Sequence, residues 1–260
     1  QKPKYVLLFG DGSFDNRFLL SVWSENDKRT QLLIYQSEES LSETSSYSVE
    51  DYIGFLDDDE GATDSAMESS LLDISIGRLP VRNETEVAEV LNKIQQYMDD
   101  KDKGIWKNNV AFLADDLISG QGVEKEDTHF LQSDAHAERI QKDYPSFIVN
   151  KIYMDAYERV ITANGGRYPE VTKILEDKFN SGLLFLNFMG HGSTTSWTNE
   201  QTFINSDILA LRSTRYPLVI TATCDFGFFD AYERAGGELF LLNSHGGAIA
   251  LFTTTRVVYS

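Results

Sequence analysis

The chain has little cysteine, little proline and no long apolar run: its 260 residues include one cysteine and five prolines. A single cysteine excludes an intramolecular disulfide and leaves one free thiol to explain. No run approaches the roughly 18 apolar residues of a membrane-spanning helix, and no basic segment followed by an apolar one opens the chain as a secretory signal would. A membrane-embedded chain and a disulfide-stabilised scaffold are therefore not expected.

Positive charge is also scarce, with 23 Lys and Arg against 41 Asp and Glu and a formal net charge of -18. This charge repels phosphate groups and disfavours nucleic acid and anionic membranes as partners. The 41% hydrophobic content is typical of a folded chain, long enough for one large or two smaller α/β units. Apolar segments lie almost at both ends of the chain. We therefore expect the chain to be an excised part of a longer protein, in which segments after Ser260 contribute further residues to the substrate pocket.

Short apolar runs alternate with amphipathic stretches, a pattern typical of parallel strands buried on both faces and joined by helices. It predicts an α/β fold with open, mostly parallel sheets flanked by helices. The polar, lysine-rich segment 99–109 predicts a boundary between an N-terminal α/β subdomain, 1–105, and a second one, 106–260. Strands are expected at 5–9, 32–35, 73–77, 109–114, 147–153, 183–188, 218–221 and 248–253, and helices after Asn83 and at about 127–144 and 169–180.

Two of these strands end in residues that can carry chemistry. His191 lies between two glycines in LLFLNFMGHGS, and Cys224 follows the next strand in LVITATCDFGFFD. If these strands are neighbours, both side chains face the crevice at the carboxyl ends of a parallel sheet, where ligands bind. His191 would act as the general base that generates the Cys224 thiolate. The backbone N–H groups of Gly192 and Cys224 would form the oxyanion hole.

Each of these features has an ordinary structural explanation when taken alone. A lone cysteine in an apolar strand is more often a buried small hydrophobe, and Gly-His-Gly is more often a tight turn. The alternative function is therefore a catalytically silent α/β scaffold that binds partners. The order of histidine and then cysteine at consecutive strand ends favours catalysis.

Other polar residues are weaker candidates. His129 and His136, seven apart on one expected helix, are interpreted as surface or structural residues and not as zinc ligands, and His245 as a turn residue. The acidic loops DGSFDN and LDDDEG have oxygen ligands that suit calcium as a structural ion, but neither matches the EF-hand pattern. No catalytic cofactor or metal is expected.

The segments NFMGHGSTTSW and ITATCDFGFFD resemble the histidine and cysteine motifs of the gingipain-like cysteine peptidases. The resemblance extends over YVLLFGDGSFDN, GFLDDDEG, DISIGRLPVRN and GGAIALFTTTRVVYS, nearly the whole chain. It implies a caspase-like fold and a cysteine peptidase with Cys224 and His191 as its dyad. It also implies an acidic partner for the histidine, assigned to Asp116 with Asp115 as the other candidate. Asp127 would be the acid of the substrate pocket, although an acid in a first helical turn explains it as well.

The end of the chain is most similar to the branch that acts as sortase and signal peptidase of the type IX secretion system. This similarity implies protein substrates with C-terminal secretion signals, other secretion components as partners, and a location on the outer, extracellular side of the cell surface. It also implies two reactions of one acyl-enzyme, hydrolysis or transfer to the amine of a surface glycolipid.

Overall fold

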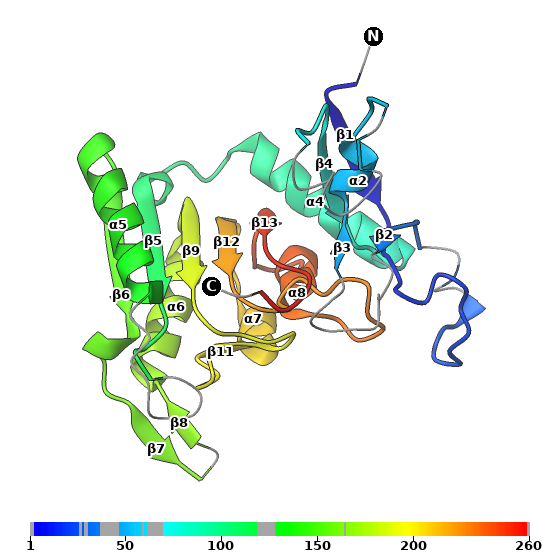
Figure 1. The fold of residues 1–260 in the computed structure, drawn as a ribbon. Coiled ribbons are helices and arrows are strands. Elements are labelled where there is room, and N and C mark those ends of the chain that lie inside the picture. The colour runs from blue at the N-terminus through cyan, green and yellow to red at the C-terminus, as the bar shows by residue number, and fades with distance from the viewer. Residues whose placement is uncertain are drawn as a thin grey trace.

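The computed structural model describes residues 3–25, 28, 31–36, 47–58, 60–61, 70–118, 128–163 and 165–258. Its centre is a five-stranded sheet in which all neighbouring strands are parallel. The strands lie side by side in Figure 1. Their order across the sheet is β13 (Ala250–Phe252), β12 (Leu218–Ala222), β9 (Phe185–Met189), β5 (Asn109–Ala114) and β6 (Ile148–Tyr153). The expected parallel α/β architecture is therefore confirmed.

The chain changes direction across the sheet between β5 and β9. From β5 it continues to β6 at one edge, and it then returns to β9 on the other side of β5 and proceeds through β12 to β13. Loops that leave adjacent strands in opposite directions open a crevice at their carboxyl ends, the preferred ligand site of open α/β sheets. The residues that follow β5 and β9 lie at this crevice.

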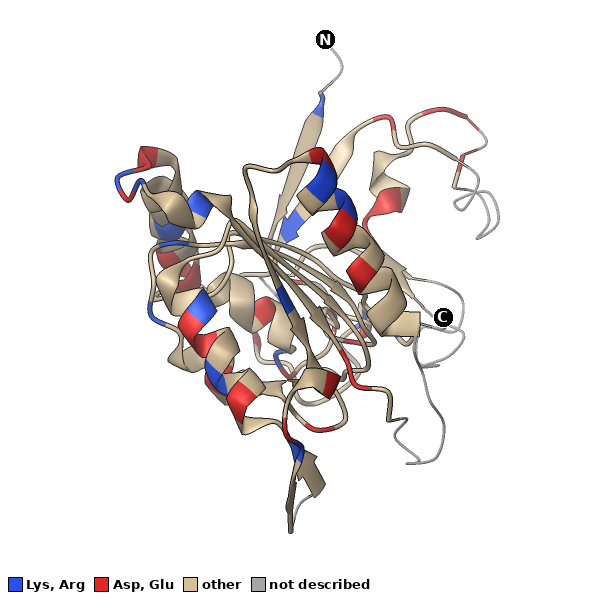
Figure 2. Ribbon diagram, turned by 90° about the vertical axis from the view of Figure 1, so that its left-hand side faces the viewer, with Lys and Arg blue, Asp and Glu red and all other residues tan. Residues whose placement is uncertain are grey.

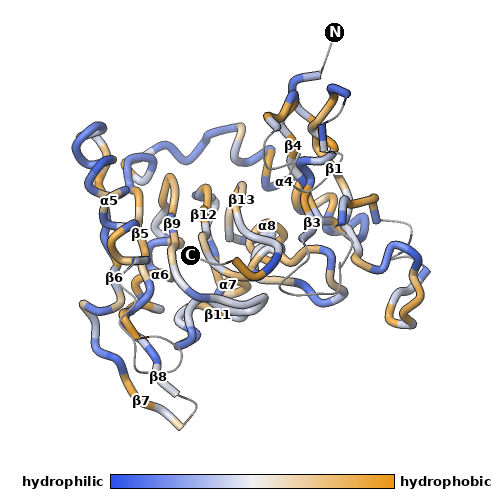
Figure 3. Tube along the Cα trace, viewed as in Figure 1, coloured by the Kyte–Doolittle hydropathy of each residue, from blue (hydrophilic) through white to orange (hydrophobic). Residues whose placement is uncertain are grey.

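Helices cover both faces of the sheet because alternate strand residues point to opposite sides. On one face, Ala137 of α5 (Thr128–Asp143) packs with Val110 and Phe112 of β5. On the other face, α6 (Pro169–Ser181), α7 (Asn205–Ala210) and α8 (Gly236–Leu242) share an apolar cluster with β5, β9 and β12. Charged residues gather along the helices in Figure 2, and Figure 3 shows apolar residues concentrated in the strands.

The N-terminal part contains a second, small parallel sheet of β1 (Tyr5–Phe9) and β4 (Ser75–Leu79). The expectation of strands buried on both faces is wrong for β1, since Tyr5 is 76% and Leu7 57% exposed. Within the described residues, only β4 pairs with β1. All strands of the five-stranded sheet follow residue 106, but the subdomain boundary there remains a prediction.

The remaining elements connect or flank these two sheets. Asn83 caps α4 (Glu84–Asp99) by accepting a 3.0 Å hydrogen bond from the backbone N–H of Glu86. None of the helices in the described ranges is long and apolar enough to span a bilayer. The other elements are β2 (Tyr35–Gln36), β3 (Ser48–Val49), α2 (Asp51–Gly54), η1 (Ile105–Asn108), η2 (Met154–Ala156), β7 (Val160–Thr162), β8 (Gly165–Arg167), β10 (Ser196–Trp197) and β11 (Phe203–Ile204).

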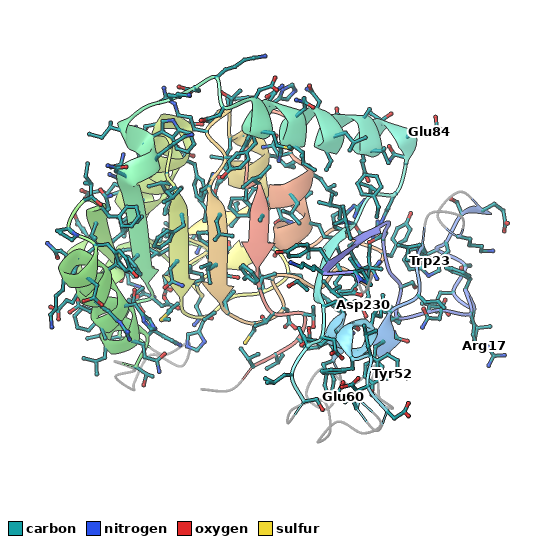
Figure 4. All side chains as sticks on the ribbon, turned by 90° about the horizontal axis from the view of Figure 1, so that it is seen from above. Arg17, Trp23, Tyr52, Glu60, Glu84 and Asp230 are labelled. Atoms are coloured by element: carbon teal, nitrogen blue, oxygen red, sulfur yellow. The ribbon has the colours of Figure 1, made fainter. Side chains whose placement is uncertain are left out.

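A buried ion pair joins the N-terminal part to the end of the chain. The Arg256 guanidinium donates to both carboxylate oxygens of Asp230, at 2.9 and 2.7 Å, and to the Ser48 hydroxyl of β3 at 3.1 Å. Asp230 is fully buried and Arg256 is 5% exposed. Figure 4 labels Asp230 where the two parts of the molecule meet. This contact holds the segment after β13 against β3.

Arg256→Met should lower the free energy of unfolding by about 3–5 kcal/mol, because it leaves the Asp230 carboxylate buried without its charge partner. Lys173→Met is the matched control, since Lys173 pairs with Asp177 across an exposed helix surface and should change stability by less than about 1 kcal/mol. Urea denaturation followed by circular dichroism measures both. Equal, small effects would show that the buried pair contributes no more than an exposed one.

Candidate active site

The loops that follow β5, β9 and β12 converge at one edge of the sheet. Met189, the last residue of β9, is in register with Ala114 of β5 and with Ala222 of β12. The strands before His191 and Cys224 are therefore neighbours, which was the condition for both side chains to face one crevice. Thr223 and Cys224 continue from β12 beside the Gly190–Gly192 turn, whose Gly190 N–H donates to the Ala222 carbonyl at 3.2 Å.

Both glycines of the Gly-His-Gly turn are required by close contacts. A Cβ atom on Gly190 would lie 2.5 Å from the Cβ atom of Asp115, and one on Gly192 would lie 2.3 Å from the Thr223 hydroxyl oxygen. Real Cβ atoms do not approach other atoms so closely. The absence of a side chain at Gly190 therefore leaves room for Asp115 beneath His191. The absence of one at Gly192 allows the histidine turn to pack against Thr223, the residue before Cys224.

Asp115 is the carboxylate that supports the histidine turn. Its Oδ2 accepts a 2.8 Å hydrogen bond from the backbone N–H of His191, and its Oδ1 accepts one of 2.9 Å from the N–H of Asp116. Burial raises the pKa of Asp115 to about 7, while these N–H donors and the charge of His191 act in the opposite direction. One Asp115 oxygen also lies within 4.8 Å of a His191 ring nitrogen.

Asp116 is also buried, but its side chain has other partners. Its Oδ2 accepts a 2.7 Å hydrogen bond from the Tyr168 hydroxyl, and its Oδ1 accepts from the backbone N–H of Ile118 at 2.9 Å. The geometry therefore favours Asp115, the second of the two carboxylates considered, as the partner of His191. Asp127, the expected pocket acid, lies outside the described residues.

Behind these aspartates lies Glu200, which sequence analysis did not single out. Glu200 is 4% exposed, lies within 4.8 Å of the carboxylate oxygens of Asp115 and Asp116, and accepts a 2.9 Å hydrogen bond from Arg159. Its sequence context, SWTNEQ, has no pattern that marks a site. The Arg159–Glu200 pair joins the base of the β7–β8 hairpin, which projects beyond the end of β6 in Figure 1, to the loop after His191.

Cys224 is partly buried, so its side chain is not enclosed in the core. Its sulfur donates a weak hydrogen bond to the Val258 carbonyl at 3.6 Å. The next residue, Asp225, has a φ of 56°, in the left-handed region that non-glycine residues rarely adopt. A sharp turn thus begins directly after the cysteine, and its Asp225 N–H donates to the Arg256 carbonyl at 3.2 Å.

The two expected oxyanion donors are positioned in these same turns. Among the described residues, the backbone N–H groups of Gly192 and Cys224 have no hydrogen-bond acceptor. Backbone N–H groups without an internal partner at a reaction centre are suited to stabilise an oxyanion. The oxyanion-hole assignment remains a prediction that this geometry supports.

The other histidines differ in their surroundings. His136 is exposed, as expected of a surface residue. His129 is only partly exposed, and its ring lies edge-to-face against that of His191, with centroids 5.2 Å apart. The interpretation of His129 as a surface or structural residue did not anticipate this contact with His191. Its contact with His191 joins segments 62 positions apart, which helical spacing alone does not predict.

A cavity of about 830 Å³ lies next to the cysteine turn, between β3, β4 and the segment after β13. Val258, whose carbonyl accepts from Cys224, is one of its lining residues. Phe229 and Phe252 contribute apolar surface, and the charged side chains of Arg78 and Arg256 are paired with Glu50 and Asp230. Asp51 adds a carboxylate to the lining, and the cavity can accept a chain segment beside the thiol.

The acidic loops considered for calcium have different arrangements. Asp11 of DGSFDN is fully buried and pairs with Arg82, and Asp15 accepts from the N–H groups of Leu19 and Leu20. In LDDDEG, Asp57 and Glu60 lie within 4.8 Å of Asp73. The first loop therefore uses its carboxylates in protein contacts, and calcium at the second stays a prediction.

Gly192→Ala should lower kcat/KM by about 10²-fold, because the added methyl group displaces the histidine turn or Thr223 by about 1 Å. Gly77→Ala is the matched control, since a Cβ atom at Gly77 meets nothing within 4 Å. Steady-state cleavage of a fluorogenic peptide measures both variants. Full activity of Gly192→Ala would show that close contact between the two turns is not needed.

Comparisons with known proteins agree with this architecture. Residues 1–260 match the family described as Peptidase family C25. The fold is similar to the crystal structure of the Arg-specific cysteine proteinase gingipain R (RgpB), with a TM-score of 0.65 and 16% identity over 98% of this chain and 49% of that one. It is also similar to the complex of Porphyromonas gingivalis RgpB pro- and mature domains, with a TM-score of 0.57 and 17% identity over 97% and 50% of the two chains.

A third solved structure, described as a protease, has a TM-score of 0.57 and 16% identity over 96% of this chain and 44% of its own. No curated protein matches the chain. The chain thus spans about half the length of the solved structures that it resembles.

Proposed function

The chain belongs to peptidase family C25, and from this premise we propose that it is the catalytic region of a gingipain-like cysteine endopeptidase. The observation that carries the proposal is the convergence of the His191 and Cys224 turns at the carboxyl ends of adjacent strands, with Asp115 buried under His191. A structural cysteine needs neither a neighbouring histidine turn nor a supporting carboxylate. A catalytic thiol needs both a base and an orienting group.

In the proposed reaction, His191 takes the proton of Cys224 and the thiolate attacks the carbonyl carbon of a peptide bond. The N–H groups of Gly192 and Cys224 stabilise the oxyanion that forms. His191 then gives its proton to the leaving amine as the C–N bond breaks, which leaves a thioester. Asp115 holds the turn of His191 and stabilises the imidazolium. Water or an amine attacks the thioester and regenerates the thiol.

The natural substrates are proposed to be cargo proteins of the type IX secretion system, cleaved at their C-terminal secretion signals. This finer assignment rests on the similarity of CDFGFFDAYERAGGELFLL and GGAIALFTTTRVVYS to PorU, the sortase and signal peptidase of that system. The cavity beside Cys224 offers room for such a segment, with apolar surface from Phe229 and Phe252 and with Arg78 and Arg256 paired to Glu50 and Asp230. Other secretion components would be partners, on the extracellular side of the cell surface.

The test uses the full-length protein that contains this chain and a cargo protein that carries its C-terminal signal. Intact-mass analysis of the product, with and without an added primary amine, separates the two fates of the acyl-enzyme. Hydrolysis gives the free carboxylate, and transpeptidation adds the mass of the amine less water. No cleavage at the signal junction, together with cleavage of unrelated peptides, would rule out the signal-peptidase role and leave a general peptidase.

A further inference from the structure

A second histidine lies beside the general base and has no part in the proposed reaction. His129, the second residue of α5, packs edge-to-face on His191. The Asp115 carboxylate lies at the same place, and one ligand atom from each of Asp115, His129 and His191 lies within 4.8 Å of the other two. Two imidazoles and one carboxylate therefore converge at the crevice.

This set of donors matches a known class of metal site. Zinc and related dications bind imidazole nitrogen and carboxylate oxygen at about 2.0–2.2 Å, and sites with three protein ligands complete a tetrahedron with water. Ligand atoms around such an ion are about 3.3 Å apart, so atoms that now lie within 4.8 Å of one another would complete the site by closing by up to about 1.5 Å.

Two features of the surroundings favour a cation there. Asp115 is fixed by two backbone N–H donors and is 2% exposed, so one ligand is held in place before the ion arrives. The carboxylates of Asp116 and Glu200 lie within 4.8 Å of that of Asp115. A cation that enters this negative pocket gains favourable electrostatic energy in a region of reduced dielectric.

We propose that Asp115, His129 and His191 form a binding site for a zinc-class dication, and that the bound ion reversibly inhibits the peptidase. A neutral imidazole has one ring nitrogen with a free lone pair, and metal coordination by His191 uses that lone pair, so none is left to accept the Cys224 proton. The inhibitory effect rests on the proposed function, whereas metal binding does not. The site would couple the activity of this protein to the concentration of free zinc.

Metal binding is tested first without the thiol, which is itself a zinc ligand. In a Cys224→Ala protein, Zn²⁺ affinity is measured by isothermal titration calorimetry, and Co²⁺ absorption reports tetrahedral coordination. His129→Gln should weaken Zn²⁺ binding by about 100-fold or more. His136→Gln, an exposed histidine on the same helix, is the matched control and should leave binding unchanged. His129→Glu keeps a ligand atom and should retain more affinity than His129→Gln.

Equal Zn²⁺ affinity in the Cys224→Ala and His129→Gln,Cys224→Ala proteins would overturn the proposal, as would the absence of binding in the Cys224→Ala protein. Thermal melting without metal verifies that the His129 variants fold. In protein with the thiol intact, inhibition is expressed as a fraction of each protein's own activity without zinc. The Zn²⁺ concentration for half-inhibition should then be at least about 100-fold higher in His129→Gln than in the wild type. Binding that depends on His129 in a protein without any peptidase activity would support the site and reject the proposed function instead.

Discussion

Cys224→Ala is expected to lower kcat/KM for a peptide substrate by at least about 10³-fold, because it removes the thiolate that forms the acyl-enzyme. The substitution removes one sulfur from a partly buried position, where within the described residues the thiol makes a weak hydrogen bond to the Val258 carbonyl. The free energy of unfolding should therefore change little. Steady-state cleavage of a fluorogenic peptide, together with urea denaturation of the same preparation, measures both effects.

His191→Ala should cause a loss of similar size, since a nucleophile and its base act as a unit. The double variant should then be no worse than either single variant. His245→Ala is the matched control, because His245 lies in the turn after α8, where its backbone N–H donates to Asn243. Losses that multiply in the double variant would contradict a joint role of the two residues.

Asp115→Asn should lower kcat by about 10²- to 10⁴-fold. Both oxygens of Asp115 accept from backbone N–H groups, and an asparagine must place an NH2 group against one of them. The charge that stabilises the His191 imidazolium is lost as well. Asp116→Asn is the matched comparison and should be far milder, because the Tyr168 hydroxyl can accept from the new NH2 group while Ile118 still donates to the remaining oxygen.

The pH profile provides an additional readout for Asp115. Because burial raises the pKa of Asp115 to about 7, its protonated fraction increases as the pH falls through 7, and kcat of the wild type should decline there. That part of the decline should be absent from the residual activity of Asp115→Asn. A larger loss in Asp116→Asn than in Asp115→Asn would instead assign the partner role to Asp116.

The sequence predicts the regular elements of the sheet well. The strands expected at 5–9 and 109–114 have these bounds in the structure, and those near His191 and Cys224 differ by one or two residues. At 109–114 a continuous apolar run produces this agreement, since few structures other than a central parallel strand bury such a run on both faces. The order of the strands was not predictable from the runs. It arises from long-range packing that places α5 and α6 on opposite faces.

Other features depend on contacts between distant segments and left no local pattern. A strand was expected at 32–35, but within this range only Tyr35 belongs to a strand, β2. Leu32 and Leu33, the apolar residues that suggested the strand, are exposed. The β7–β8 hairpin lies in a polar stretch with a glycine pair, which hid its short strands. His129 and Glu200 reach the site only through the positions of α5 and of the loop after β10. Their roles become visible once these elements are placed around the sheet.

The central claim is that His191 activates Cys224. It is tested most directly by the rate of Cys224 alkylation with iodoacetamide at pH 6, compared between wild type and His191→Ala. A base that holds the thiol as thiolate keeps alkylation fast at mildly acidic pH, so the account predicts at least about a tenfold slower reaction in His191→Ala. Slow alkylation of the wild type, at the same rate as in His191→Ala, would contradict the account and favour a catalytically silent scaffold.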